Sequence, residues 1–93
     1  MFEAWVPRLT RVVVVKDDPS KGARVAMAEV ELEGAVWVGG FAVYPDKTGL
    51  GLRVLPPTTR GADGRRVPIF RSREGRVEKE IARRVLEELE RMG

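Results

Sequence analysis

Short apolar segments bounded by turn residues occupy the first two thirds of the chain and predict β-strands. Residues 9–15 form a β-branched run that is too short for a helix and is typical of a strand covered on both faces at its centre. Residues 26–33 alternate, with Ala26, Ala28, Val30 and Leu32 on one face and Glu29, Glu31 and Glu33 on the other. This alternation indicates an antiparallel strand with one face in solvent.

Two more strands are expected after the turn at Gly34. The third covers residues 35–44, where Gly39-Gly40 indicates a bulge or a close backbone approach. The fourth covers residues 50–55 and ends at Pro56-Pro57.

The next segment has weaker strand character. Residues 58–64 are predicted to form a loop that ends in the Asp63-Gly64 turn. Residues 66–70 are predicted as a short fifth strand, which Pro68 confines to the edge of the sheet.

After Ser72 the spacing of apolar residues changes to three and four. This spacing predicts a helix of about 18 residues, with Ser72 as its N-cap. Its apolar stripe consists of Val77, Ile81, Val85, Leu89 and Met92. Glu80–Arg84 and Glu87–Arg91 are expected to form ion pairs four residues apart.

These elements predict a single α+β domain over residues 1–93, an antiparallel sheet of four to five strands followed by a C-terminal helix. One helix can cover only one face of that sheet. Because residues 9–15 are apolar on both faces, we expect a homodimer. The second copy would cover the remaining apolar surface of the sheet, either by continuing the sheet or by exchanging the helix.

Composition narrows the possible chemistry. The chain has no Cys and no His, which removes disulfides, the usual zinc ligands and the commonest general base. The N-terminus lacks the features of a secretory signal, and the longest apolar run, Val12 to Val15, is too short to span a bilayer. We therefore expect a cytoplasmic protein without membrane contact, cofactor, metal or small-molecule substrate, and without enzymatic activity.

Positive charge is concentrated in one segment. Between Arg53 and Arg76 lie seven arginines and only two acidic residues, so this segment carries a net charge of +5. The residues before this segment have a net charge of −1, and so do the residues after it, so the net charge of the whole chain is +3. The planar guanidinium suits bidentate phosphate contact, and a local cluster of this kind predicts a surface for a polyanion.

The candidate nucleic-acid-binding residues belong to this segment: Thr58, Thr59, Arg60, Arg65, Arg66, Arg71, Arg73 and Arg76. The arginines would contact phosphates, and the threonine hydroxyls would add hydrogen bonds. The last three arginines flank the start of the helix, whose dipole and free N–H groups also attract anions. The alternative is a solvated surface whose arginines pair with Glu29, Glu31 and Glu33.

Aromatic residues give a weaker signal. Trp5, Trp37, Phe41 and Tyr44 are candidates for stacking on bases. Trp37 and Phe41 lie in an apolar run and are expected in the core or in an interface. Phe70 is the only aromatic residue within the basic segment, so its composition gives little indication of base stacking.

The order of several motifs resembles the stage V sporulation protein G family of bacterial septation proteins. The similar segments are Arg8-Leu9-Thr10-Arg11-Val12, Ala26-Met27-Ala28-Glu29-Val30, Gly49 to Pro57, Asp63-Gly64, and the helix from Val77 through Glu88. They span most of the chain at low identity. The resemblance implies a dimer of small α+β subunits that binds DNA or RNA through its basic loop and the adjoining helix start. It also implies a part in septum formation, cell division and sporulation-linked regulation.

This chain departs from the family pattern at the loop. Where the family has a Lys-Arg pair after the proline, this chain has Thr58-Thr59-Arg60, with one cation and one extra residue. The family's His-Asp-Ile segment in the third strand is here Gly39-Gly40-Phe41. A sequence preference therefore does not carry over. The competing hypothesis, from a different class, is a protein–protein adaptor whose basic loop docks on an acidic partner.

Overall fold

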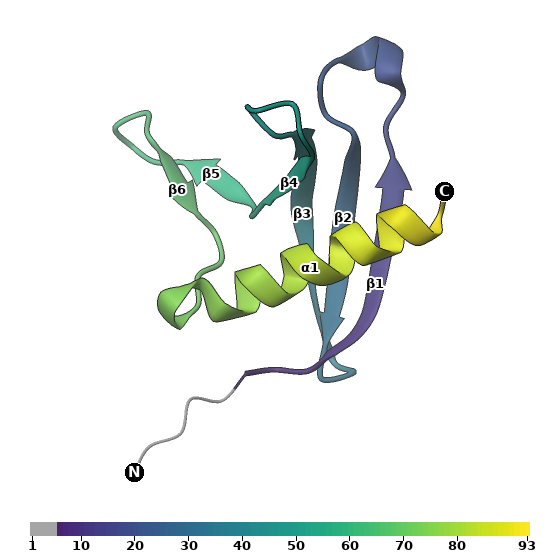
Figure 1. Ribbon diagram of the computed structural model, residues 1–93. Helices are drawn as coiled ribbons and strands as arrows, with labels where there is room; N and C mark the ends of the chain where they lie inside the picture. Colours follow the sequence, from purple (N-terminus) through teal and green to yellow (C-terminus); the bar gives the residue numbers. More distant parts are fainter. Residues whose placement is uncertain (1–5) are drawn as a thin grey trace.

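The chain folds as an α+β domain, which the computed structural model describes over residues 6–93 (Figure 1). The first sheet is antiparallel and has the order β1 (Leu9–Lys16), β2 (Ala26–Leu32), β3 (Val36–Pro45), β4 (Leu52–Leu55). A second sheet pairs β5 (Thr58–Arg60) with β6 (Arg66–Pro68), and α1 (Arg76–Arg91) closes the chain. Short 3-10 turns occupy Pro19–Lys21 and Arg73–Gly75. Trp5 lies outside the described residues.

The helix α1 crosses one face of the four-stranded sheet and encloses the core (Figure 1). Its buried residues are Val77, Ile81, Val85 and Leu89, as the apolar spacing predicts. They belong to one buried cluster with the alternating residues of β2, which are all buried. Met92, the last residue of the predicted stripe, follows the helix and is 45% exposed.

The opposite face of the sheet, called here the open face, is not covered by the helix. Glu29 and Glu31 of β2 lie on it, as predicted. On β1, Val15 is 63% exposed on this face. The expectation that β1 is covered on both faces is therefore not met within a single chain.

A bulge at Gly39-Gly40 decides which aromatic residues reach the open face. Val30 pairs with Val38 and Ala28 pairs with Phe41, so two residues of β3 stand opposite Glu29. This extra residue reverses the alternation of side chains along β3. Phe41 is buried at 1% exposure, as expected, whereas Trp37 lies on the open face at 43% exposure. Trp37 is therefore outside the core of the single chain, and its place in an interface stays a prediction.

The prediction of a fifth strand at the edge of the main sheet is wrong. Residues 66–68 pair instead with residues 58–60, which were predicted as loop. Pro56-Pro57 ends β4 and redirects the chain away from the sheet, so the following residues find a partner across the Asp63-Gly64 turn. The product is a two-stranded hairpin, β5–β6, which projects beyond the sheet (Figure 1).

The ion pairs on α1 differ from the predicted ones. Arg83 bonds both Glu80, three residues before it, and Glu87, four residues after it. Arg91 pairs with Glu88 at 2.6 Å rather than with Glu87. On a helix a carboxylate can pair with a cation three or four residues away, and the spacing in the sequence does not decide which of the two pairs forms.

Candidate nucleic-acid interface

Five of the eight candidate residues belong to the β5–β6 hairpin. Thr58, Thr59 and Arg60 form β5, Arg65 follows the tight turn, and Arg66 begins β6. All five are exposed. The register pairs Arg60 with Arg66, so these two guanidinium groups leave the same face of the hairpin.

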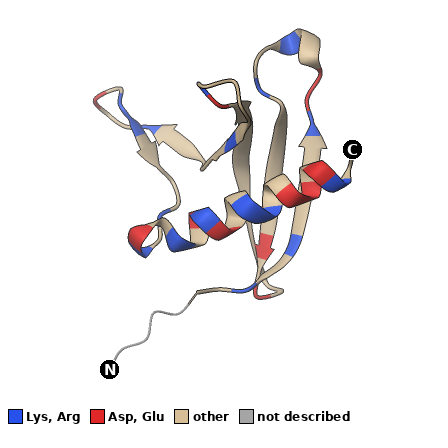
Figure 2. Cartoon of the chain, viewed as in Figure 1, with Lys and Arg blue, Asp and Glu red and all other residues tan. Residues whose placement is uncertain are grey.

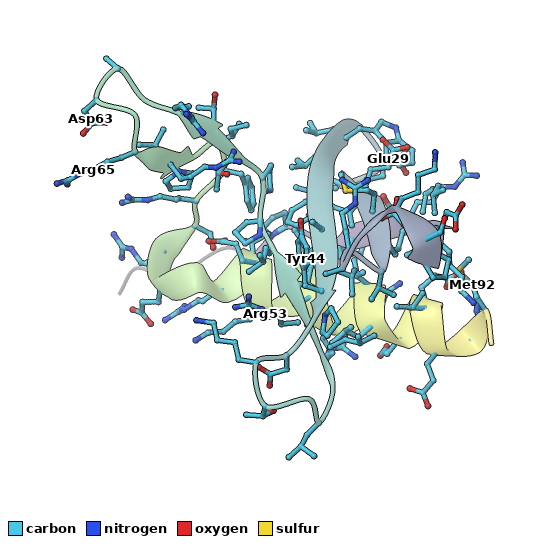
Figure 3. The ribbon with its side chains drawn as sticks, turned by 90° about the horizontal axis from the view of Figure 1, so that it is seen from above. Glu29, Tyr44, Arg53, Asp63, Arg65 and Met92 are labelled. Atoms are coloured by element: carbon cyan, nitrogen blue, oxygen red, sulfur yellow. The ribbon has the colours of Figure 1, made fainter. Side chains whose placement is uncertain are left out.

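The turn of this hairpin is held by short local hydrogen bonds. Gly61 N–H donates to the Arg65 carbonyl at 2.7 Å, and Arg65 N–H donates to the Asp63 carboxylate at 3.0 Å. Asp63 and Arg65 mark the tip of the hairpin in Figure 3, far from the sheet. The hairpin therefore presents its arginines on a projecting arm.

The other three candidates surround the start of α1. Arg71 lies in the connection after β6, Arg73 in the 3-10 turn, and Arg76 at the first position of the helix, and all three are exposed. The hairpin and the helix start lie at the same end of the molecule (Figure 1), and both segments contain basic residues (Figure 2). The fold thus brings the two groups of candidates to one end.

Ser72 organises this helix start. Its hydroxyl accepts a hydrogen bond from Val77 N–H at 2.9 Å and donates to the Glu78 carboxylate, which also accepts from Ser72 N–H at 3.3 Å. The prediction of Ser72 as the N-cap of the helix is wrong, because a 3-10 turn intervenes and the N-cap of α1 is Gly75. The Ser72 hydroxyl nevertheless bonds the first turn of α1 through Val77 N–H. Glu74 and Gly75 in that turn both have positive φ, 56° and 65°.

Most of the candidate arginines carry an unneutralised charge. Arg65 lies 3.7 Å from Asp63 and Arg76 lies 3.2 Å from Glu74, both at exposed positions where an ion pair is weak. Within residues 6–93, Arg60, Arg66, Arg71 and Arg73 form no ion pair.

The alternative in which these arginines pair with the glutamates of β2 does not hold in the described part of the chain. Glu31 accepts a hydrogen bond from the Thr10 hydroxyl at 2.9 Å, and Glu33 accepts one from Arg8 N–H at 2.7 Å. Both partners belong to the N-terminal part of the chain. The basic segment is therefore free to face a polyanion.

A groove lies between the hairpin and the open face, and several of the residues that line it were not among the candidates chosen from the charge pattern. It has a volume of about 490 Å³. The sheet supplies Met27, Tyr44 and Leu55, and the hairpin supplies Thr58 and Arg66. Figure 3 places Tyr44 near the middle of the molecule, away from the hairpin tip. Tyr44 was a stacking candidate, but its position beside the hairpin depends on the bulge and on the course of the chain after β4.

Arg24 lines the same groove from the segment before β2. Its guanidinium donates to both oxygens of Asp17, at 2.6 Å and 3.0 Å. This hydrogen bonding raises the pKa of Arg24, and the nearby Tyr44 phenol acts in the same direction. The same contact with Arg24 lowers the pKa of Asp17. The pair holds Arg24 in place beside the groove.

Comparison of the chain with protein-family models and with curated proteins gives no match. Among residues 6–93 no cluster of three or more acidic side chains is arranged to hold a metal ion. No helix of this described part has the length and apolar character needed to cross a membrane.

Proposed function

We propose that this chain is a nucleic-acid-binding regulatory protein that contacts DNA or RNA through the β5–β6 hairpin and the start of α1. The observation that carries the proposal is the gathering of exposed arginines at one end of the molecule, four of them without an ion pair among the described residues. Nucleic-acid phosphates are the polyanion for which such a surface is suited, because each contact releases condensed counterions.

The candidate residues have distinct roles in this proposal. Arg60, Arg65 and Arg66 on the hairpin, and Arg71, Arg73 and Arg76 at the helix start, contact phosphates. Thr58 and Thr59 add hydrogen bonds from their hydroxyl groups. Contacts of this kind position a protein on nucleic acid without reading its sequence. The protein is not an enzyme in this proposal and needs no cofactor.

The biological role follows from the resemblance to the stage V sporulation protein G family. On that basis we place the chain among cytoplasmic regulators of septation, cell division and sporulation-linked gene expression.

The proposal includes a homodimer. Its support is the apolar surface left on one chain: Val15 of β1 is 63% exposed and Ile69, after β6, is 64% exposed. The outer edge of β1 also has no neighbouring strand in the described sheet. An unpaired edge beside apolar side chains favours association with a second copy.

The test is direct binding of labelled random-sequence DNA and RNA, followed by fluorescence anisotropy at low and at high salt. We expect binding at low salt that weakens steeply as salt rises. We also expect the purified protein to carry a high 260/280 absorbance ratio that falls after a high-salt wash. Absence of binding to both nucleic acids at low salt would favour the adaptor that docks on an acidic protein.

A further inference from the structure

We propose that the groove between the β5–β6 hairpin and the open face holds an unpaired base, so that the chain binds single-stranded nucleic acid in preference to duplex. This inference rests on the proposed function and names the form of nucleic acid that the site selects. The base would lie against the ring of Tyr44, and the adjoining phosphates would contact Arg66, which lines the same groove.

The first argument is the shape and lining of the groove. Apolar residues such as Met27 and Leu55 line it from the sheet, and Thr58 and Arg66 line it from the hairpin. The volume of about 490 Å³ lies within the range of roughly 300–1,000 Å³ that is typical of small-molecule sites. A lining that combines apolar side chains with an aromatic residue and cations fits a nucleotide.

The second argument is the position of the aromatic ring. Tyr44 is half-buried on the open face, and its position on that face depends on the bulge at Gly39-Gly40. A base in a duplex has both faces covered by its neighbours, so only an unpaired base can present a face to this ring. Stacking of this kind is the usual way in which proteins hold single strands.

The third argument is the distribution of charge. Arg66 forms no ion pair within residues 6–93, and its Nη1 lies 3.4 Å from the Thr58 hydroxyl, so it remains available at the groove. Arg53 stands directly opposite Tyr44 in the next strand and also has no ion-pair partner in the described chain. Both charges favour phosphate beside Tyr44.

The acidic residues of the open face limit the site to this corner. Glu29 and Glu31 lie farther along β2, and Figure 3 shows Glu29 on the side of the sheet away from the helix. Trp37 stands directly opposite Glu31, and the guanidinium of Arg11 lies over its ring, 5.9 Å from the ring centroid, so the ring face already has a partner from the same chain. A single strand is therefore expected at Tyr44 and not at Trp37, although both rings share one face.

The experiment compares Tyr44→Ala, Tyr44→Phe and Trp37→Ala by anisotropy, with a single-stranded oligonucleotide and a duplex of the same sequence. We expect Tyr44→Ala to weaken single-strand binding roughly 5- to 150-fold, the effect of losing one stacked base. Tyr44→Phe keeps the ring and should bind like the parent chain. Trp37→Ala is the matched control and should leave binding unchanged, because its ring lies outside the groove.

A second measurement does not depend on the folding of a variant. Tyr44 is the only tyrosine of the chain. Irradiation of the parent protein with a 5-bromouracil-substituted single strand should cross-link Tyr44, as identified by mass spectrometry. Cross-linking only to Trp37, or to hairpin residues without Tyr44, would overturn the inference.

The outcomes separate this inference from the proposed function. If arginine substitutions on the hairpin weaken binding but Tyr44→Ala does not, the groove inference fails and the proposed function stands. If the parent chain binds neither single strand nor duplex, both fail. Equal affinity for duplex and single strand also overturns the inference. A Tyr44→Ala variant that changes the mass of the dimer but not nucleic-acid binding overturns it as well, because a second copy would then occupy the groove.

Discussion

Gly40 and Pro57 are in contact, and this contact joins the hairpin to the sheet. Gly40 has a φ of 86°, and a Cβ added to it would lie 3.0 Å from the Cβ of Pro57. Pro57 is buried there, directly before the first residue of β5. The bulge glycine therefore has two roles, because it reverses the alternation of β3 and leaves room for the hairpin to approach.

Replacing Gly40 by Ala should lower the free energy of unfolding by about 1–3 kcal/mol, since the left-handed backbone is strained for alanine and the new methyl group meets Pro57. Urea denaturation measures the change. Gly51→Ala is the matched control, because a Cβ at that position meets nothing within 4 Å. A similar loss in both variants would mean that the contact with Pro57 is unimportant.

Truncation of the helix core should be costly. Ile81 is fully buried, and Ile81→Ala should lower the free energy of unfolding by about 2–5 kcal/mol through lost burial and a residual cavity. Lys79 is exposed and has no ion-pair partner among the described residues, so Lys79→Ala should change the free energy of unfolding by less than about 0.5 kcal/mol. Comparable losses measured by thermal unfolding would contradict the assigned face of α1.

Loss of the Ser72 hydroxyl should weaken the start of α1. Ser72→Ala removes the acceptor for Val77 N–H and leaves the Glu78 carboxylate without its donor, so we expect a loss of about 0.5–2 kcal/mol. Denaturant unfolding measures the loss. Ser20→Ala is the control, because that hydroxyl bonds Asp18 within an exposed turn and should matter less. A Ser72→Ala variant as stable as the parent chain would show that these hydrogen bonds do not stabilise the start of α1.

Binding should depend steeply on salt. If one chain neutralises about four phosphates, log K against log salt should have a slope of roughly −2.8 for a single strand and −3.6 for a duplex. Arg65→Ala combined with Arg66→Ala should flatten that slope by roughly one to two units and weaken binding to all sequences alike. Folding should be nearly unchanged, since both residues are exposed.

The control for this prediction removes charge elsewhere. Lys16→Ala combined with Lys21→Ala removes two cations at and just after the end of β1, outside the hairpin. We expect a clearly smaller effect on affinity and on the slope. Equal losses in the two double variants would indicate diffuse attraction to a basic protein rather than a site.

Dimerisation should be visible in sedimentation equilibrium at micromolar concentration, with a mass about twice the 10.4 kDa of one chain. An interface that completes the core should bury at least ~1,200 Å² in total. Val15→Glu places a charge on exposed apolar surface near the free edge of the sheet and should favour the monomer. A well-folded monomer of the parent chain would contradict the proposal.

Much of the fold could be predicted because the relevant signals are local. The alternation in residues 26–33 and the spacing of Val77, Ile81, Val85 and Leu89 predict which side chains are buried, and these residues are buried as predicted. Each pattern depends on one element with a regular period, so no knowledge of its partners is required. The N-cap was not predicted correctly, because the 3-10 turn at Arg73–Gly75 moves the start of α1 away from Ser72.

The placement of the aromatic residues could not be predicted in this way. Trp37 and Tyr44 are seven residues apart, an odd separation that places side chains on opposite faces of a regular strand. The Gly39-Gly40 pair signals a bulge, but only the pairing with β2 shows that one extra residue is inserted. The groove beside Tyr44 depends on that pairing.

The sequence by itself determined the strands β1 to β4, the amphipathic helix and the concentration of arginine between Arg53 and Arg76. Only the tertiary structure decided that residues 58–60 pair with residues 66–68 in a separate hairpin, and that Tyr44 and Arg66 line the same groove. The physical reason is that periodicity and charge belong to single segments, whereas strand pairing and the groove require segments distant in the chain to meet.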